Sequence, residues 1–262
     1  MNIDISSQRV LVSAASTGLG KATACAFQRA GAKVAICARG VEQLEIARQE
    51  IEALTGKPVL SFVTDLSRAD DINNMMDNVL SQWGAVDVLV NNAGGPPSGN
   101  HDSIDDEQWG SAFDLTLRSA IRLTDRVLPG MKDSGSGRII NLSSYSVKQP
   151  LNSMLLSNSL RLGALGWAKT LSNEVAKYNI LVNTICTGWT KTQRIDQLIE
   201  ARAQAEGIDR QELASGLIAN IPLRRMAEPE EIAAVALFLA SPAASYITGA
   251  AIPVDGGFAQ TI

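Results

Sequence analysis

Short apolar, β-branched runs alternate with helical patterns along almost the whole chain, and this alternation limits the fold more than any other feature. The first strand is predicted at 10–12, and apolar residues then recur at helical spacing until Gly31 ends the helix. Further strands are predicted at 34–37, 59–63, 86–90, 138–142, 180–185 and 251–254, and further helices at 41–54, 69–82, 105–132, 155–177 and 229–240. This βαβ pattern predicts an α/β fold, a doubly wound parallel sheet of the Rossmann type with seven strands flanked by helices.

The chain is predicted to form one domain over residues 1–262, because no linker, low-complexity stretch or internal repeat interrupts the alternation. The segment 193–222 is the exception, since it is charged, helical in composition and outside the strand–helix pattern. It follows the sixth predicted strand and therefore emerges at the carboxyl edge of the sheet, where ligands bind. We expect a lid over a substrate, and a plain pair of surface helices is the alternative.

Composition excludes several classes of function. The net charge of −4 argues against nucleic acid or an anionic membrane as the main partner, and no apolar run approaches the roughly 20 residues that span a bilayer. The N-terminus lacks the pattern of a secretory signal, so a cytoplasmic protein is expected. The three cysteines, which are far apart, are expected to be reduced. Because His101 is the single histidine, histidine-based triads and histidine-rich metal sites are not expected, and we predict no metal.

The segment 13–20 joins the first predicted strand to the first predicted helix and contains Gly18 and Gly20. These glycines would let the backbone approach a pyrophosphate at the helix N-terminus, where N–H groups and the helix dipole favour anions. A purely structural turn is the alternative. The residues of this loop expected to contact a cofactor are Ser13, Ala15, Ser16, Thr17, Gly18, Leu19 and Gly20.

The end of the second predicted strand indicates which dinucleotide the loop would bind. A site selective for NAD usually places an acidic residue near this point to bind the ribose hydroxyls, whereas Cys37 is uncharged and Arg39 follows it. An arginine can bind a 2′-phosphate through two hydrogen bonds. We therefore predict NADP(H), and an exposed loop arginine with no ligand is the alternative.

Further motifs extend this pattern over residues 6–258. Asp65 and Leu66 follow the third predicted strand, the sequence Asn-Asn-Ala-Gly ends the fourth at residues 91–94, and Thr187-Gly188 follows the sixth. With these motifs the chain resembles a classical short-chain dehydrogenase/reductase, in particular the 3-oxoacyl-reductase-like branch. Two departures in the phosphate loop are Ser13 and Ala14, and Ala14 stands where the family has the glycine of the tight turn.

The resemblance implies further cofactor contacts. Asp65 and Leu66 would hold the adenine ring, although Asp65 could instead cap the next helix. Asn92, Ala93 and Gly94 would run along the cofactor, and the turn after the sixth strand would bind the nicotinamide amide and the phosphates. The residues of that turn are Thr187, Gly188, Thr190 and Thr192.

The proton-transfer residues depart from the family pattern. The family uses an Asn-Ser-Tyr-Lys tetrad in which Tyr is the acid, Lys lowers its pKa and holds the nicotinamide ribose, Ser polarises the carbonyl, and Asn positions a water. On this chain Ser144 keeps the serine, while Thr116 replaces Asn, Ser157 replaces Tyr and Arg161 replaces Lys. Arg161 can still hold the nicotinamide ribose and keeps the positive charge, but it cannot release a proton. Ser157 is a far weaker acid than a phenol.

A substitute acid is therefore needed, because general acid catalysis contributes roughly 10²- to 10⁴-fold. Tyr145 is one candidate. Strand alternation predicts that Tyr145 points away from the site if Ser144 faces it, but the chain is leaving the strand there. Lys148 and His101 are weaker candidates, and Ser157 acting through a water is another.

Two hypotheses about function follow. The first is an NADP(H)-dependent oxidoreductase acting on a small carbonyl compound or secondary alcohol with a non-standard proton donor. The second is a cofactor-binding protein without ordinary redox turnover, such as a sensor, an assembly partner, or a retooled lyase or isomerase. The resemblance also implies a homo-oligomer, a dimer or tetramer paired through the helices at 105–132 and 155–177, and a monomer on gel filtration would contradict this.

Overall fold

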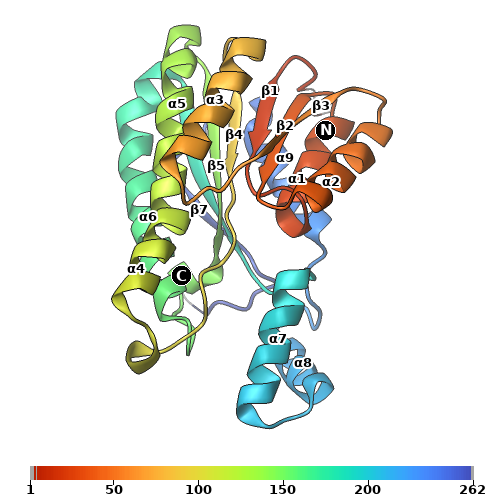
Figure 1. Ribbon diagram of the computed structural model, residues 1–262, viewed down its shortest axis with the longest axis vertical. Helices are drawn as coiled ribbons and strands as arrows, with labels where there is room; N and C mark the ends of the chain where they lie inside the picture. The colour runs from red at the N-terminus through yellow and green to blue at the C-terminus, as the bar shows by residue number, and fades with distance from the viewer. Residues whose placement is uncertain (1–2, 4, 261–262) are drawn as a thin grey trace.

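The predicted strands form one parallel sheet in the computed structural model, which describes residue 3 and residues 5–260. The strand order is β3-β2-β1-β4-β5-β6-β7 (Figure 1), which confirms the doubly wound, seven-stranded fold. The strands are β1 (Arg9–Val12), β2 (Lys33–Ala38), β3 (Val59–Val63), β4 (Val88–Asn91), β5 (Gly137–Ser144), β6 (Ile180–Thr187) and β7 (Ala251–Val254). β5 and β6 are longer at their carboxyl ends than the sequence pattern indicates, and this extension carries Ser144 and Thr187 to the sheet edge.

The strand order reverses next to β1, which pairs with β2 on one side and with β4 on the other. The helices that follow β1 and β4 leave toward opposite faces, so their first turns separate at this point. Open α/β sheets bind ligands in the crevice that this separation leaves outside the carboxyl ends of the strands. The topology therefore predicts the position of the site independently of any motif.

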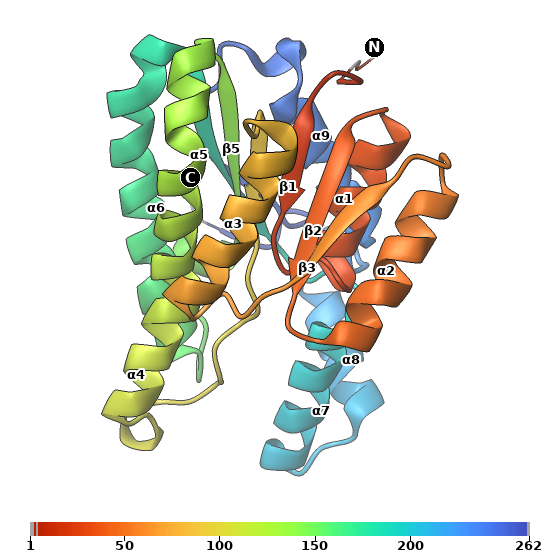
Figure 2. The same cartoon turned by 45° about the horizontal axis from the view of Figure 1, so that its top comes forward.

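Two helical layers cover the sheet, because successive strand residues point to opposite faces. Val10 and Val12 pack with α1, α2 and α9, whereas Leu11 between them packs with α3, α5 and α6. Figures 1 and 2 show the helices on the two sides of the sheet. The helices are α1 (Gly18–Arg29), α2 (Val41–Ala53), α3 (Ala69–Trp83), α4 (Asp106–Phe113), α5 (Ser119–Ser134), α6 (Leu155–Val175), α7 (Gln193–Glu206), α8 (Arg210–Ala219) and α9 (Pro229–Ala240). Of the helices that the structure describes, none is long and apolar enough to cross a membrane.

The helix predicted at 105–132 is divided in the structure. α4 and α5 are separated by a π-helical turn, Asp114–Arg118. Such a turn inserts one residue into the helical register, and π-turns occur frequently at functional sites. The turn contains Thr116 and buries it, with 9% of its surface exposed. The sequence pattern does not show this break, because the apolar spacing continues on both sides of it.

The segment 193–222 forms the helix pair α7 and α8, which projects from the carboxyl edge of the sheet (Figures 1 and 2). The pair has an apolar core of its own, which includes Ile199, Leu213 and Leu217. Trp189 and Phe258 pack against that core and connect it to the body of the protein. The segment is therefore anchored at one end and free of the main sheet along its length.

Candidate active site

A cleft of about 1190 Å³ opens at the carboxyl ends of the central strands. Its walls come from the 13–20 loop, the ends of β4 and β5, the start of α6, the turn after β6, and α7. Pockets for single small ligands usually measure about 300–1000 Å³. The cleft is therefore large enough for a dinucleotide together with a small second molecule.

The 13–20 loop is held against the end of β4 by hydrogen bonds between Ser13 and Asn92. Ser13 Oγ donates to the Asn92 carbonyl oxygen over 2.7 Å, and the Asn92 backbone N–H donates to Ser13 Oγ over 2.9 Å. Asn92 Nδ2 also donates to the Ala14 carbonyl oxygen over 3.0 Å. The residues of this loop that line the cleft are Ala14, Ser16, Thr17, Gly18 and Leu19. The other three predicted contacts in the loop do not line it, namely Ser13, Ala15 and Gly20.

The N-terminus of α1 fits an anionic group. The N-cap residue Thr17 makes no side-chain capping bond, so the N–H groups of the first turn are available to a ligand. A Cβ on Gly20 would lie 2.4 Å from the Ala14 carbonyl oxygen, which only glycine avoids. Gly18 has a φ of +54°, which favours glycine. A Cβ added to Gly18 would lie 3.4 Å from Thr192 Cγ2. The loop therefore has the close backbone approach that a pyrophosphate requires.

Ala14 has a φ of +46°, so the alanine accepts the left-handed conformation that the turn imposes. This conformation costs a non-glycine residue roughly 1–2 kcal/mol. We expect Ala14→Gly to raise the free energy of unfolding by about 1 kcal/mol, since part of this gain is lost to the greater freedom of glycine in the unfolded chain. Denaturant unfolding at constant m value would measure the change, and unchanged or reduced stability would contradict it.

The far end of the cleft is formed by Arg39 and Leu66, both of which line it. Asp65 does not. Its Oδ1 accepts hydrogen bonds from the Ser67 backbone N–H over 2.9 Å and from the Ser67 hydroxyl over 2.7 Å. Burial raises the pKa of Asp65, but the two Ser67 donors and the charge of Arg39 outweigh burial and lower it. The carboxylate therefore stabilises the turn into α3, and Arg39 remains the charged side chain at this end.

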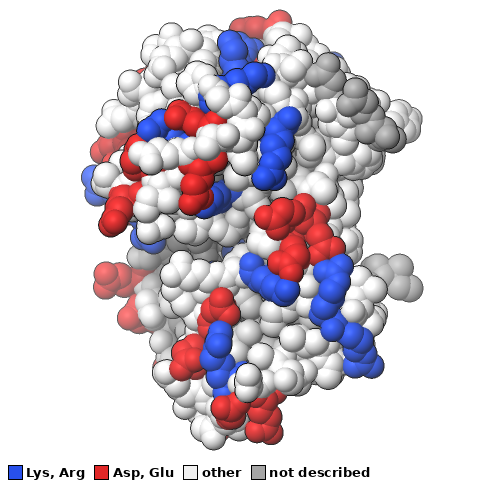
Figure 3. Space-filling model, turned by 90° about the vertical axis from the view of Figure 1, so that its right-hand side faces the viewer, with Lys and Arg blue, Asp and Glu red and all other residues white. Residues whose placement is uncertain are grey.

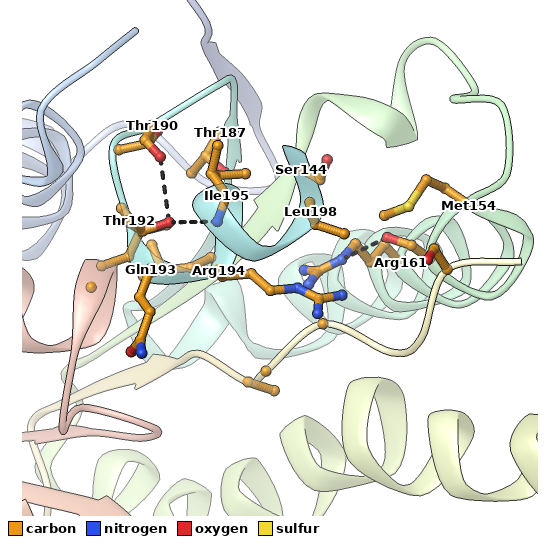
Figure 4. A pocket seen from close by; sticks show the side chains of 18 of the residues that line it. Ser144, Met154, Arg161, Thr187, Thr190, Thr192, Gln193, Arg194, Ile195 and Leu198 are labelled. Carbon is orange, nitrogen blue, oxygen red and sulfur yellow. Dashed lines mark hydrogen bonds between the residues drawn. The ribbon is translucent and has the colours of Figure 1, made fainter. Parts of the chain in front are cut away.

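The turn after β6 forms the opposite wall (Figure 4). A Cβ on Gly188 would lie 2.5 Å from the Asp255 Cα, so the turn needs glycine to pass the end of β7. Thr187 Oγ1 donates to the Ser143 carbonyl oxygen over 2.9 Å, and Thr190 Oγ1 donates to the Gly188 carbonyl oxygen over 3.2 Å. These bonds hold the wall in place beside β5.

Two serine hydroxyls face the centre of the cleft, and each accepts a hydrogen bond from a nitrogen. Ser144 Oγ accepts from the Ser146 backbone N–H over 3.1 Å, at the end of β5. Ser157 Oγ accepts from Arg161 Nε over 3.1 Å, one turn along α6. In both cases the hydroxyl proton stays available to a ligand. Burial lowers the pKa of Arg161 to about 10, with a further contribution from the charge of Arg194, and the guanidinium is still protonated at neutral pH.

Comparison with known proteins agrees with this arrangement. A sequence model for a family described as enoyl-(acyl carrier protein) reductase matches residues 13–259. The chain is 33% identical over 247 residues to the 3-oxoacyl-(acyl-carrier-protein) reductase of Thermotoga maritima, which covers 94% of this chain and 96% of that protein. The chain belongs to the short-chain dehydrogenase/reductase family.

Solved structures of other short-chain dehydrogenase/reductases superpose closely on this one. The L-sorbose reductase of Gluconobacter frateurii, solved with NADPH and L-sorbose, has a TM-score of 0.95 and 32% identity, with full coverage of both chains. A short-chain oxidoreductase of Pseudomonas aeruginosa, solved with NADPH and described as containing an atypical catalytic center, has a TM-score of 0.89 and 29% identity, covering 99% of this chain and all of that one. The fold of this family thus occurs with an altered catalytic centre.

Tyr145 is turned into the protein interior in this short-chain dehydrogenase/reductase. Its side chain is 3% exposed and packs against Phe258, with ring centroids 4.9 Å apart, and against Trp189 at 6.2 Å. Its hydroxyl has no hydrogen-bond partner within the described part of the chain. Burial raises the pKa of Tyr145 well above its usual value. The phenol therefore contributes an apolar wall, and Lys148 and His101 do not line the cleft.

Thr116 lines a second, smaller cavity of about 40 Å³ behind the cleft, and Arg161 lines both spaces. Four polar atoms of residues that line this cavity have no hydrogen-bond partner among the residues described: Thr116 Oγ1, Asn91 Oδ1, Asn141 Nδ2 and Ser143 Oγ. These atoms could hydrogen-bond one water, and the cavity is large enough to hold it. The π-helical turn is what directs Thr116 there.

Arg194 in the first turn of α7 is a site residue that the motifs do not show. Its Nη2 donates to the Pro96 carbonyl oxygen over 2.8 Å, and its guanidinium extends toward Arg161 (Figure 4). The first turn of a helix disfavours cations because its N–H groups carry partial positive charge. A basic residue at this position of the predicted lid is the one sequence signal that could have identified it.

Proposed function

We propose that this chain is an NADP(H)-dependent oxidoreductase that transfers a hydride between the nicotinamide and a small carbonyl compound or secondary alcohol, in the manner of a 3-oxoacyl reductase, with Ser157 as the proton donor. One observation carries the proposal: Ser144 and the Ser157–Arg161 pair line the same cleft as the uncapped N-terminus of α1.

The donor set supports NADP(H) as the cofactor. The N–H groups at Gly18 and Leu19 would hold the pyrophosphate, and Arg39 would bind the 2′-phosphate at the far end. Residues 92–94 would run along the cofactor, and Thr190 and Thr192 would contact its nicotinamide half. The NADPH in the structures of the Gluconobacter and Pseudomonas proteins agrees with this assignment.

The two serines provide the polar contacts for a reacting carbonyl. When bound, a reduced nicotinamide supplies a hydride to the carbonyl carbon. Ser144, which already accepts the Ser146 N–H, would donate its proton as a hydrogen bond to the carbonyl oxygen. Ser157 would give its proton to that oxygen as the negative charge develops, which leaves an alcohol and a serine alkoxide.

Arg161 makes this role of Ser157 feasible. An aliphatic hydroxyl is a weak acid, but a positive charge within hydrogen-bond distance favours its ionised form. Arg161 Nε, 3.1 Å from Ser157 Oγ, supplies that charge without releasing a proton of its own. Water in the cleft would then return a proton to the alkoxide. Tyr145 is a poorer donor, because it lies among aromatic rings and burial raises its pKa.

The helix pair α7–α8 would serve as a lid. Leu198 and Arg202 of α7 line the cleft, and the pair is joined to the body mainly through Trp189 and Phe258. Closing such an element over a bound substrate would exclude water from the site.

The second candidate function is binding of the cofactor without ordinary redox turnover. The substitution of three of the four tetrad positions, by Thr116, Ser157 and Arg161, favours it. It predicts that NADPH binds but is not consumed with any carbonyl compound.

The test is NADPH consumption at 340 nm over ketones, β-ketoacyl thioesters, oxo acids and quinones. We expect wild-type turnover with NADPH. In Arg39→Gln we expect kcat/KM for NADPH to fall by about 10- to 100-fold while that for NADH stays unchanged, since charge-assisted hydrogen bonds to the 2′-phosphate are lost. Binding of NADPH with no consumption across the panel would reject the oxidoreductase in favour of the second candidate, and an equal loss for both cofactors would reject the role of Arg39.

A further inference from the structure

We propose that the cleft recognises a substrate that carries a carboxylate, and that Arg194 together with Arg161 forms the carboxylate-binding pair. The inference rests on the proposed function only for the reaction that follows binding. It names the substrate class as small oxo acids and the corresponding hydroxy acids.

The two arginines come from distant segments and meet at one point of the cleft. Arg161 lies on α6 and Arg194 on α7, and Figure 4 shows their guanidinium groups directed toward one another. The Pro96 carbonyl oxygen, which accepts from Arg194 Nη2, fixes one side chain, and Ser157 Oγ fixes the other through Arg161 Nε. The remaining N–H donors of both groups have no hydrogen-bond acceptor among the described residues.

Neither guanidinium has an acidic partner within residues 3 and 5–260, whereas most of the other arginines in this part of the chain form an ion pair. Arg48 pairs with Glu45 and Glu52, and Arg225 pairs with Glu231. Figure 3 likewise shows basic and acidic side chains next to one another on the face that it draws. A surface arginine without a partner is solvated by water, whereas these two are half-buried and face each other.

Two adjacent positive charges in a partly desolvated site are unfavourable without a counter-ion. Burial lowers the pKa of both groups, and the charge of Arg194 lowers the pKa of Arg161 further. A carboxylate placed between them would compensate both charges and could accept several charge-assisted hydrogen bonds in the fork geometry that guanidinium groups present.

The position of the pair favours a substrate over a cofactor phosphate. The groups suited to phosphates, the N-terminus of α1 and Arg39, lie in other walls of the cleft. The pair lies beside Ser157, and Ser144, Met154 and Leu198 are its neighbours in Figure 4. A small acid held here would therefore place its carbonyl near the two serines and its apolar part against Met154 and Leu198.

The kinetic test compares acids with their neutral esters. Pyruvate, 2-oxobutanoate and acetoacetate would each be assayed beside the methyl ester, with wild type and Arg194→Gln. We expect wild type to prefer the acids, and Arg194→Gln to raise KM for the acids by about 10- to 100-fold with KM for the esters unchanged. Arg210→Gln is the matched control, because Arg210 is exposed, pairs with Asp196 and does not line the cleft. Equal use of acids and esters would overturn the inference and leave the proposed function intact.

A binding measurement separates the inference from catalysis. Butyrate, which has no carbonyl to reduce, would be titrated into the NADPH-bound protein by calorimetry. We expect binding that weakens by about 10- to 100-fold in Arg194→Gln, with the Kd of NADPH itself unchanged. Weaker NADPH binding in that variant would assign the arginines to the cofactor and overturn the inference. Butyrate binding without turnover of any acid would support the inference and reject the proposed function.

Discussion

Replacing Ser144 with alanine is expected to lower kcat/KM for NADPH-dependent reduction by about 10²- to 10³-fold, the loss typical of removing one donor to a developing oxyanion. Ser144 Oγ accepts the Ser146 N–H, which leaves its own proton directed to the ligand. Because the side chain lines an open cleft, the variant should keep the NADPH affinity of wild type. The lost hydrogen bond from the Ser146 N–H should lower its free energy of unfolding by only about 1 kcal/mol. Steady-state kinetics, fluorescence titration with NADPH and a denaturant melt would measure the three quantities.

Ser146→Ala is the matched control for this loss. Its hydroxyl is buried without a hydrogen-bond partner in the described part of the chain, and it does not line the cleft. The variant keeps the backbone N–H that holds Ser144, so kcat/KM should remain close to that of wild type. A similar loss in both variants would show that the effect comes from disturbing the end of β5 and would contradict the role given to Ser144.

The fold could be predicted from the sequence because its main determinants are local. Each buried strand is a short apolar run, each helix has its own apolar face, and the right-handed crossover rule then leaves few arrangements. The apolar pattern underestimates the lengths of β5 and β6, because Ser143, Ser144 and Thr187 are polar and their pairing depends on the neighbouring strand. The pattern also does not reveal the break at Asp114–Arg118, because a π-turn changes the register of the helix without changing the spacing of its apolar residues.

The site was less predictable, because it depends on where separate segments meet. The phosphate loop and Arg39 follow strands directly, and Ser144 ends β5, so topology places them at one sheet edge. Asp65 also follows a strand, yet its carboxylate neither lines the cleft nor caps α3, because it is bonded to Ser67 in the turn before that helix. Arg194 depends on the direction in which α7 leaves the sheet, and no local pattern gives that direction. Its contact with the loop after β4 is visible only in three dimensions.

Arg161→Met is expected to remove activity and to stabilise the unliganded protein at the same time. Without the guanidinium, Ser157 loses the charge that favours its ionised form, so we expect kcat to fall by about 10²- to 10⁴-fold, the range attributed to general acid catalysis. Arg161 is half-buried, has Arg194 as a like-charged neighbour, and is bonded only to Ser157 within the described residues. Methionine fills a similar space without a charge, so the free energy of unfolding should rise by about 1 kcal/mol.

Arg161→Lys separates charge from shape in this experiment. Lysine keeps the positive charge near Arg194, so it should give no gain in stability, and it should retain more activity than methionine because a cation remains beside Ser157. Denaturant midpoints of the protein without ligand and kcat with NADPH would be measured for the three proteins. A loss of stability in Arg161→Met would mean that the native protein already compensates the charge of Arg161. That result would contradict the prediction that this charge destabilises the unliganded protein. A gain in stability together with lost turnover would indicate that the unpaired charge is maintained for its function.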